Sequence, residues 1–234
     1  MRRIHRRRKL QARDFGINSI RLMSVNISTV VFDLGGVLID WNPRYLYRQL
    51  FEDEERMEWF LANICTPEWN AMQDAGRSFE AATRELIEQH PEHEEDIRAY
   101  YTRWHEMLAG PIQGTVEILR EIRDSPYRLY ALTNWSAEAF PVARQRYDFL
   151  EWFEGIVVSG EIGMIKPDLE IFEHLAQVYD IVPRESVFID DVPANVNTAR
   201  EAGYHAVRFA TPDQLRTDLD ALGVKLNESP PEIK

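Results

Sequence analysis

A chain of 234 residues with 44% hydrophobic residues can bury one sizeable core with an inserted subdomain, and its single cysteine, Cys65, excludes an internal disulfide and a cysteine-based zinc cluster. The net charge is -12 although residues 1–22 carry eight Lys/Arg against one acid, so the rest of the chain is strongly acidic and is not expected to bind nucleic acid. No apolar run approaches the roughly 18–20 residues of a membrane-spanning helix, and residues 1–23 lack the apolar stretch of a secretory signal, so we expect a cytoplasmic protein without a membrane partner.

The first part of the chain predicts a basic leader, one strand and a helical insertion. We interpret residues 1–24 as a disordered leader. Residues 27–32 form a short, β-branched apolar run that ends at Asp33, which predicts a buried strand leaving the sheet through a tight turn. No convincing strand follows until Gly110–Pro111. Helical spacing is found instead at residues 43–51, 54–64, 79–89 and 94–108.

From residue 111 onward, apolar runs alternate with segments of helical length. Strands are predicted at residues 127–132, 155–158, 186–189 and 205–209, and helices at residues 115–124, 137–146, 169–179, 193–202 and 212–222. The alternation indicates an α/β fold with a doubly wound, mostly parallel sheet. We therefore expect a core of residues 25–42 and 111–225, an inserted all-helical cap of residues 43–110, and a loose tail of residues 226–234.

Polar side chains follow three of the predicted strands. Asp33 follows the first strand, Thr133 the second and Asp190–Asp191 a later one. Ligands of doubly wound sheets bind outside the carboxyl ends of the strands, so these residues are the first candidates for a site. A lone aspartate there is explained equally well as a helix cap, whereas a carboxylate, a hydroxyl and paired carboxylates together indicate a function.

The clustered acids need a positive partner. Asp190 and Asp191 repel each other and leave water at a cost unless a cation or an ammonium balances them. With Asp33 they make three carboxylates, which suits Mg²⁺ in octahedral oxygen coordination. Lys166 precedes Pro167 just before a predicted helix and is a candidate ammonium, although its spacing alone favours a solvated lysine.

Four ordered motifs carry a resemblance to a known family. Val30–Leu38 (VVFDLGGVL), Leu132-Thr133-Asn134, Lys166-Pro167 and Phe188–Asp191 (FIDD) resemble those of the haloacid dehalogenase (HAD) superfamily, over about residues 25–222. The resemblance implies a Rossmann-like core with a helical cap of the C1 type, subfamily I. It also implies a phosphatase-like hydrolase that requires Mg²⁺ and acts on a small phosphorylated metabolite.

The resemblance assigns catalytic roles position by position. Asp33 resembles the nucleophile that forms an aspartyl-phosphate, while Thr133 and Lys166 resemble the groups that hold the transferring phosphoryl group. Asn134 either contacts a substrate oxygen or caps the helix that begins near Ser136. These roles agree with the general requirement for charge stabilisation in phosphoryl transfer.

The metal ligands follow from the same resemblance, with one departure. Asp191 resembles the direct ligand, Asp190 binds through water or orients its neighbour, and Asp33 and the backbone carbonyl of Gly35 complete the set. Phosphatases of the superfamily usually carry a general acid at the position of Gly35, a group that contributes about 10²–10⁴-fold. Its absence implies a slower enzyme, a good leaving group or a substitute. Asp40 is the nearby acid to consider, although a turn position explains it better.

The cap is expected to close over Asp33 and to choose the substrate. Trp41 and Arg44 are predicted to contact the substrate. Trp69, Asp74 and Arg77 are further candidates for the inner surface of the cap. The alternative for the aromatic residues is that they simply pack inside the cap.

Two other functions fit parts of the sequence. The 2-haloacid dehalogenases of the superfamily need no metal and use neutral polar residues in place of paired carboxylates, so Asp190–Asp191 argues against that activity. They also typically place an aromatic residue at the position of Gly35. A non-catalytic, metal-binding module that binds a partner protein is favoured only by Gly35, and a metal-dependent turnover assay distinguishes it from the enzyme. The sequence leaves the oligomeric state open.

Overall fold

A parallel sheet of five strands forms the centre of the molecule. The structure, a computed structural model, describes residues 26–226, so the predicted leader and nearly all of the predicted tail lie outside it. The strands are β1 (Thr29–Phe32), β4 (Arg128–Thr133), β5 (Gly155–Val158), β6 (Ser186–Asp190) and β7 (His205–Arg208), in the order β5-β4-β1-β6-β7. All four neighbouring pairs are parallel. The predicted α/β fold with a parallel sheet is therefore confirmed.

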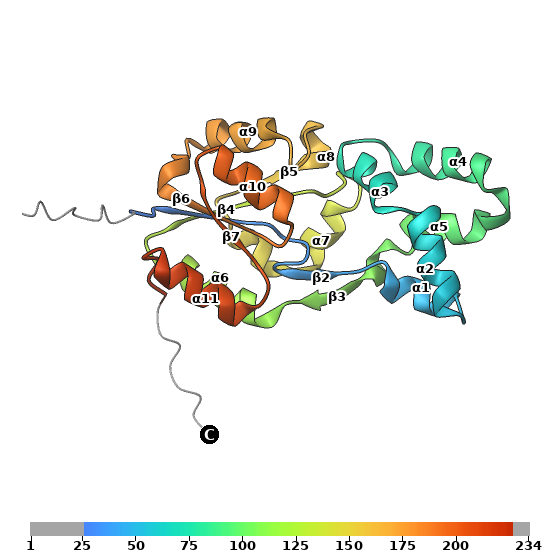
Figure 1. Cartoon of the computed structure of the whole chain (residues 1–234), viewed down its shortest axis with the longest axis horizontal. Helices are drawn as coiled ribbons and strands as arrows, with labels where there is room; N and C mark the ends of the chain where they lie inside the picture. Colours follow the sequence, from blue (N-terminus) through green and yellow to red (C-terminus); the bar gives the residue numbers. More distant parts are fainter. Residues whose placement is uncertain (1–25, 227–234) are drawn as a thin grey trace, which may run out of the picture.

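Helices cover both faces of this sheet (Figure 1). The core helices are α6 (Gln113–Arg123), α7 (Phe140–Arg146), α8 (Ser159–Ile162), α9 (Leu169–Tyr179), α10 (Pro193–Glu201) and α11 (Pro212–Ala221). Alternate residues of β1 face opposite layers, as the pleat of a strand requires. Val31 packs with apolar residues of α9 and α10, whereas Val30 and Phe32 pack with those of α6 and α11. A strand buried on both faces explains the continuous apolar run seen in the sequence.

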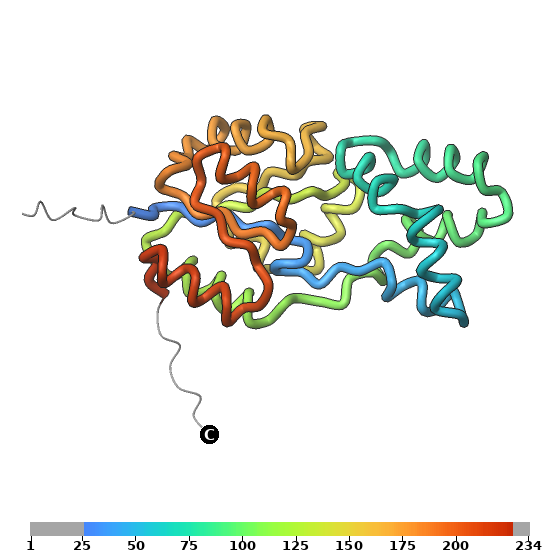
Figure 2. The backbone as a smooth tube through the Cα atoms, viewed as in Figure 1, coloured from blue at the N-terminus to red at the C-terminus, as the bar shows by residue number. Residues whose placement is uncertain are grey.

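A second, two-stranded sheet connects the core to the inserted helices. It is formed by β2 (Ile39–Trp41) and β3 (Leu108–Pro111), which pair antiparallel so that Ile39 lies opposite Pro111 and Asp40 opposite Gly110. The chain leaves the core along β2 and returns along β3 (Figure 2). The predicted helix over residues 94–108 is wrong at its end. The helix stops at Thr102, and a 3₁₀ turn at Trp104–Met107 leads into β3.

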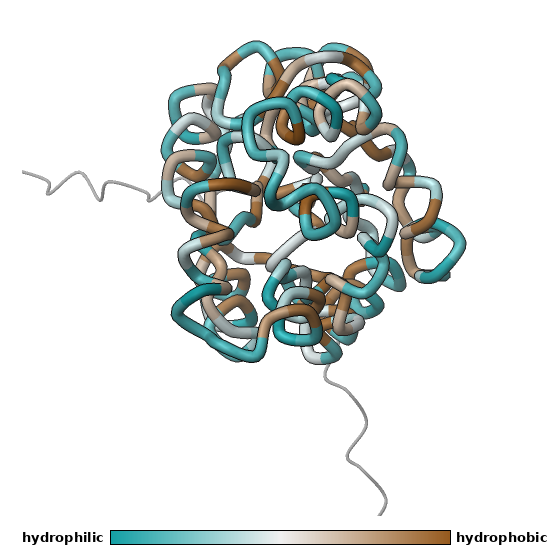
Figure 3. Tube along the Cα trace, turned by 90° about the vertical axis from the view of Figure 1, so that its right-hand side faces the viewer, coloured by the Kyte–Doolittle hydropathy of each residue, from teal (hydrophilic) through white to brown (hydrophobic). Residues whose placement is uncertain are grey.

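Between the two strands the described chain is helical. The helices are α1 (Arg44–Leu50), α2 (Glu54–Asn63), α3 (Pro67–Asp74), α4 (Phe79–Gln89) and α5 (Glu94–Thr102). Asp53, Thr66 and Ser78 cap α2, α3 and α4 by accepting a hydrogen bond from the first turn. Seen from the end of the molecule that carries these helices, the helical turns alternate between hydrophobic and hydrophilic residues, as expected for helices that bury one face (Figure 3). We call this segment the cap; its boundaries at residues 43 and 110 stay a prediction.

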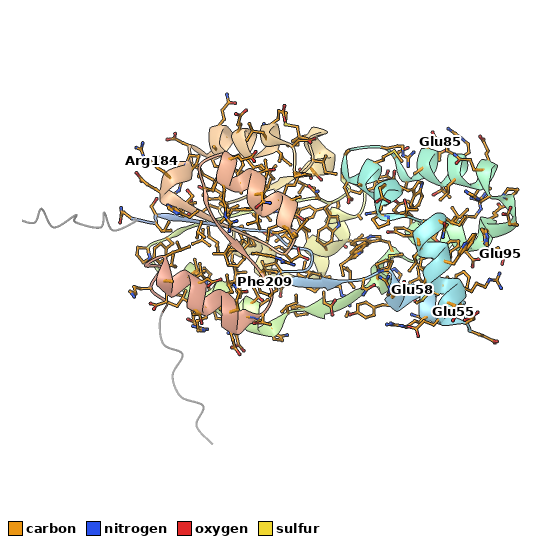
Figure 4. All side chains as sticks on the ribbon, in the orientation of Figure 1. Glu55, Glu58, Glu85, Glu95, Arg184 and Phe209 are labelled. Carbon is orange, nitrogen blue, oxygen red and sulfur yellow. The ribbon has the colours of Figure 1, made fainter. Side chains whose placement is uncertain are left out.

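Acidic side chains are prominent on the outside of the cap. Glu55, Glu85 and Glu95 are exposed and belong to three different cap helices (Figure 4). Within residues 26–226, no helix has both the length and the hydrophobicity to cross a bilayer.

Candidate active site

Neighbouring parallel strands bring Asp33 and Asp190 together. Phe32 of β1 lies in register with Ile189 of β6, so the residues that follow them meet at the carboxyl edge of the sheet. Asp33 is 7% exposed and Asp190 is completely buried. The structure thus unites two of the residues predicted from strand ends.

Lys166 lies between these two carboxylates. Its Nζ atom lies 2.9 Å from Asp33 Oδ1 and 2.7 Å from Asp190 Oδ2, and it donates to the carbonyl of Leu132 at 3.0 Å. Burial acts to lower the pKa of Lys166, but the two carboxylates outweigh it and the pKa lies above its ordinary value. The lysine is 3% exposed, so the solvated position favoured by spacing alone is wrong.

The side chain of Asn134 holds the backbone of Lys166 in place. Asn134 Oδ1 accepts from the backbone N–H of Lys166, and Asn134 Nδ2 donates to its carbonyl, both at 2.8 Å. This paired contact fixes the loop before α9 against the end of β4. Asn134 also lines the cavity described below, so its amide has a structural role whatever else it contacts.

The surroundings of Asp33 raise the pKa of its carboxyl group above the ordinary value. Burial raises its pKa to about 7, and the nearby Lys166 ammonium only partly opposes this effect. The carboxylates of Asp190 and Asp191 raise the pKa further. The backbone N–H of Leu34 donates to Asp33 Oδ1 at 2.7 Å and orients the group.

Asp33, Asp190 and Asp191 form a group that fits a divalent cation. Each offers a carboxylate oxygen, and these oxygens lie within 4.8 Å of one another. With all groups ionised, three carboxylates and the Lys166 ammonium sum to a charge of -2, which one divalent cation balances. Burial and the charge of Asp190 also raise the pKa of Asp191.

Two further residues support this group and were not found from the sequence. Asn195 Nδ2 donates to Asp190 Oδ1 at 3.1 Å and to Oδ2 at 3.0 Å, so Asp190 is fully engaged. Gly36 adopts a φ of 74°, and a Cβ atom there would lie 2.6 Å from Asp191 Oδ2. Only glycine therefore lets the backbone approach this carboxylate so closely.

A cavity of about 80 Å³ opens between the core and the cap and reaches Gly35, two residues after Asp33; the three clustered carboxylates are not part of its lining. Gly35 and Asn134 line it from the core and Asp74 from the cap. Its aromatic lining consists of Trp41, Phe79, Tyr101, Trp104 and Trp135. The rings of Phe79 and Tyr101 stack with centroids 3.8 Å apart. The cavity therefore combines apolar walls with a few polar groups, which is typical of a small-molecule site.

The sequence matches the haloacid dehalogenase-like hydrolases over residues 27–203. The chain belongs to this family. It is 29% identical to the sesquiterpene phosphatase astK of Aspergillus oryzae over 182 residues, 77% of this chain and 89% of that protein. Its fold is similar to that of a HAD-like family hydrolase from Porphyromonas gingivalis, with a TM-score of 0.67 and 23% identity over 86% of this chain and 99% of the other.

A second fold neighbour is a HAD family enzyme from Bacteroides thetaiotaomicron, whose structure contains magnesium and inorganic phosphate. The TM-score is 0.58 at 22% identity, over 79% of this chain and 95% of that chain. The parallel sheet and the helices on its two faces are therefore shared with other hydrolases of the family.

The remaining predicted residues of this hydrolase are divided between the site and the protein surface. Thr133 ends β4 and is 1% exposed, and within the described residues its Oγ1 atom has no hydrogen-bond partner. Trp41 lines the cavity, but Arg44 does not. The guanidinium of Arg44 instead binds Glu58 of α2, with Nη2 2.6 Å from Oε2. Asp40 also lies outside the cavity lining, and its carboxylate accepts from the Tyr45 hydroxyl at 2.8 Å.

Proposed function

We propose that this hydrolase is a Mg²⁺-dependent phosphatase that cleaves a small phosphoric monoester through an aspartyl-phosphate on Asp33. The observation that carries the proposal is the buried ion-pair arrangement at the sheet edge. There, Asp33 is close both to the ammonium of Lys166 and to two further carboxylates. A metal-free 2-haloacid dehalogenase has no use for three clustered carboxylates.

The donor set fits Mg²⁺ in composition and charge. Asp33, Asp191 and the backbone carbonyl of Gly35 are the proposed ligands, and Asp190, already bound by Lys166 and Asn195, is the residue that orients them. When bound, the ion would offset the repulsion between the anionic phosphate and the carboxylate of Asp33. Magnesium and phosphate in the Bacteroides neighbour support this proposal.

Asp33, Lys166 and Thr133 have separate roles in the proposed reaction. The free oxygen of Asp33 attacks phosphorus, while the ammonium of Lys166 stabilises the negative charge of the phosphoryl oxygens. The unpaired, buried hydroxyl of Thr133 is available to donate to one of those oxygens. A buried donor without a partner is rare, and a bound phosphoryl group would satisfy it.

The cavity favours an uncharged, largely apolar leaving group. Among the described residues, none that lines it is arginine or lysine, and its one ionisable carboxyl group is that of Asp74. A second phosphate on the substrate would therefore meet no cation from the protein there. Five aromatic rings offer planar apolar surfaces instead. The name of one relative, sesquiterpene phosphatase astK, is consistent with an apolar leaving group.

Phosphate release tests the proposal. The purified protein is incubated with aryl and sugar phosphates in the presence of Mg²⁺ or of a chelator, and Asp33→Asn is the control because its side-chain volume hardly changes. We expect release only with Mg²⁺ and a loss of at least about 10³-fold in Asp33→Asn, since the nucleophile is gone. If Asp33→Asn retains more than a few per cent of the wild-type rate, Asp33 is not the nucleophile.

A further inference from the structure

The leaving oxygen of a phosphoric ester needs a proton, and the core side of the cavity offers no acid. Gly35 has no side chain, and no atom lies within 4 Å of the place where its Cβ would be. Asp190 is engaged by Lys166 and Asn195, and Asp33 and Asp191 belong to the proposed metal set. A proton donor must therefore come from another wall of the cavity.

The cap brings Asp74 to that wall. Asp74 is the last residue of α3, and it is partly buried where the cap meets the core. Ser136, three residues beyond Thr133, donates its backbone N–H to the Asp74 carboxylate. Asn70 donates to Asp74 Oδ2 at 3.1 Å from the same helix. The side chain is thus held from both sides and lines the same cavity as Gly35.

The main chain of Asp74 is also attached to the core. Ser159 Oγ donates to its carbonyl at 2.6 Å. Nearby, Phe79 of the cap donates its backbone N–H to Glu138 Oε1 of the core at 2.7 Å. These contacts attach the end of α3 and the start of α4 to the start of α8 and to the loop that follows β4, so Asp74 is held at the boundary between cap and core.

The other groups on the cavity wall are less suited to proton transfer. Burial raises the pKa of the Tyr101 hydroxyl well above its ordinary value, and this hydroxyl already bonds to Gln73 and Asn70. Asp40 is outside the lining and bonds to Tyr45. Burial raises the pKa of Asp74 to about 7, although Ser136 and the charge of Lys166 oppose the shift. Near neutral pH, such a carboxyl group is present in both its protonated and its ionised form.

We propose that Asp74 of the cap is the catalytic acid and base that serves the leaving group in the reaction at Asp33. The inference rests on the proposed phosphatase function and adds a residue to it. It also gives the cap a chemical task, because the catalytic set is complete only when α3 is docked on the core.

The proton is accounted for in both steps. In the first, an Asp33 oxygen bonds to phosphorus as the ester P–O bond breaks, and the carboxyl proton of Asp74 passes to the departing oxygen, which leaves as an alcohol. In the second step, the oxygen of a water molecule attacks phosphorus while the Asp74 carboxylate takes a proton from that water. Phosphate departs, the Asp33 carboxylate is restored, and Asp74 is protonated again.

A leaving-group series tests the inference. Values of kcat/KM are measured with Mg²⁺ for dinitrophenyl, nitrophenyl, phenyl and primary alkyl phosphates, using wild type, Asp74→Asn and the matched control Glu68→Gln, an exposed acid on the same helix. We expect Asp74→Asn to lose about 10²–10⁴-fold on phenyl and alkyl phosphates. It should stay within about tenfold of wild type on dinitrophenyl phosphate, whose leaving group needs no proton. Glu68→Gln should match wild type throughout.

Rescue from the opposite wall gives a second readout. The open space at Gly35 accepts a side chain, so Gly35→Asp combined with Asp74→Asn should recover most of the phenyl phosphate activity. Asp74→Ser repeats the series if Asp74→Asn does not fold. An equal loss on every substrate, or none on phenyl phosphate, overturns the role of Asp74 while leaving the phosphatase function standing. If wild type itself releases no phosphate with Mg²⁺, the proposed function fails, and this inference with it.

Discussion

The ammonium of Lys166 lies 2.7 Å from Asp190 Oδ2, and neither side chain has more than 1% of its surface exposed. Such a buried pair adds little net stability by itself, because both charges have lost their hydration. Its value here is positional: Asn195 and Val192 hold Asp190, Asp190 holds Lys166, and Lys166 contacts Asp33. The carboxylate of Asp33 is therefore located by a chain of fixed contacts.

The first prediction concerns Lys166→Met. Removing the ammonium leaves Asp33 and Asp190 buried without a counter-charge, so we expect the free energy of unfolding to fall by about 3–5 kcal/mol. Urea denaturation at pH 8 in a chelator measures it. Lys225→Met is the matched control, since its pair with Asp220 is mostly exposed, and its unfolding curve in urea should stay close to that of wild type. Similar small losses for both variants would contradict the buried-pair assignment.

The second prediction separates Asp191 from Asp190. Asp191→Asn should raise the Mg²⁺ concentration for half-maximal activity at least about tenfold, because it removes a proposed direct ligand. Asp190→Asn should raise it less and should instead lower the melting temperature in chelator, because Lys166 loses a partner. Activity titrations give the Mg²⁺ concentration for half-maximal activity of each protein, and thermal denaturation gives its melting temperature. A larger effect on the Mg²⁺ requirement at Asp190 would reverse the assignment.

The third prediction compares two adjacent glycines. Gly36→Ala places a Cβ 2.6 Å from Asp191 Oδ2 and requires a φ of 74°, so we expect a loss of about 1–3 kcal/mol and a higher Mg²⁺ requirement. Gly35→Ala meets no atom within 4 Å and should cost less than about 1 kcal/mol. Urea denaturation and Mg²⁺ titration of both variants check this. Equal losses would mean that the contact with Asp191 is unimportant.

The fourth prediction is a pH dependence of stability that comes from Asp74. A carboxyl group whose pKa is raised on folding binds its proton more tightly in the folded state. It therefore stabilises the protein at low pH, and this contribution is lost as the pH rises from 3.8 to about 7. Over that range, the free energy of unfolding of wild type should fall relative to Asp74→Asn by roughly 1–4 kcal/mol.

Urea denaturation at several pH values in chelator measures this difference. Asp33, whose pKa is also raised, titrates in both proteins, so its contribution is removed by the comparison. Glu68→Gln serves as the control and should follow wild type at every pH. A constant difference between wild type and Asp74→Asn would mean that the pKa of Asp74 is not shifted by folding.

The sequence was sufficient to locate the sheet and the residues at its carboxyl edge. Apolar runs of strand length can be recognised from the local sequence alone. In a parallel sheet, the residues that follow these strands all lie at the same edge. Asp33, Thr133 and Asp190 could therefore be placed near one another. The contact of Lys166 with both carboxylates depends on a loop geometry, and spacing alone favoured solvent.

Other features depend on contacts between distant parts of the chain. The strands β2 and β3 are short and lie almost 70 residues apart, so only their pairing makes them strands. The helix α3 was missed although Thr66 followed by Pro67 is a helix-start signal, because its apolar stripe is weak. Arg44 shows another difficulty, since a long charged side chain has several partners within reach and the sequence does not say that Glu58 is the one.

The paired strands β2 and β3 also determine how freely the cap can change in evolution. They hold the two ends of the cap side by side, so the connection between cap and core stays the same even if the segment between the two strands changes. The entropy of closing a chain segment grows only slowly with its length, and insertions between adjacent ends are well tolerated. A recombination event at these two strands would exchange the cap and leave the sheet intact. It would also remove Asp74, so each exchanged cap would have to bring its own acid.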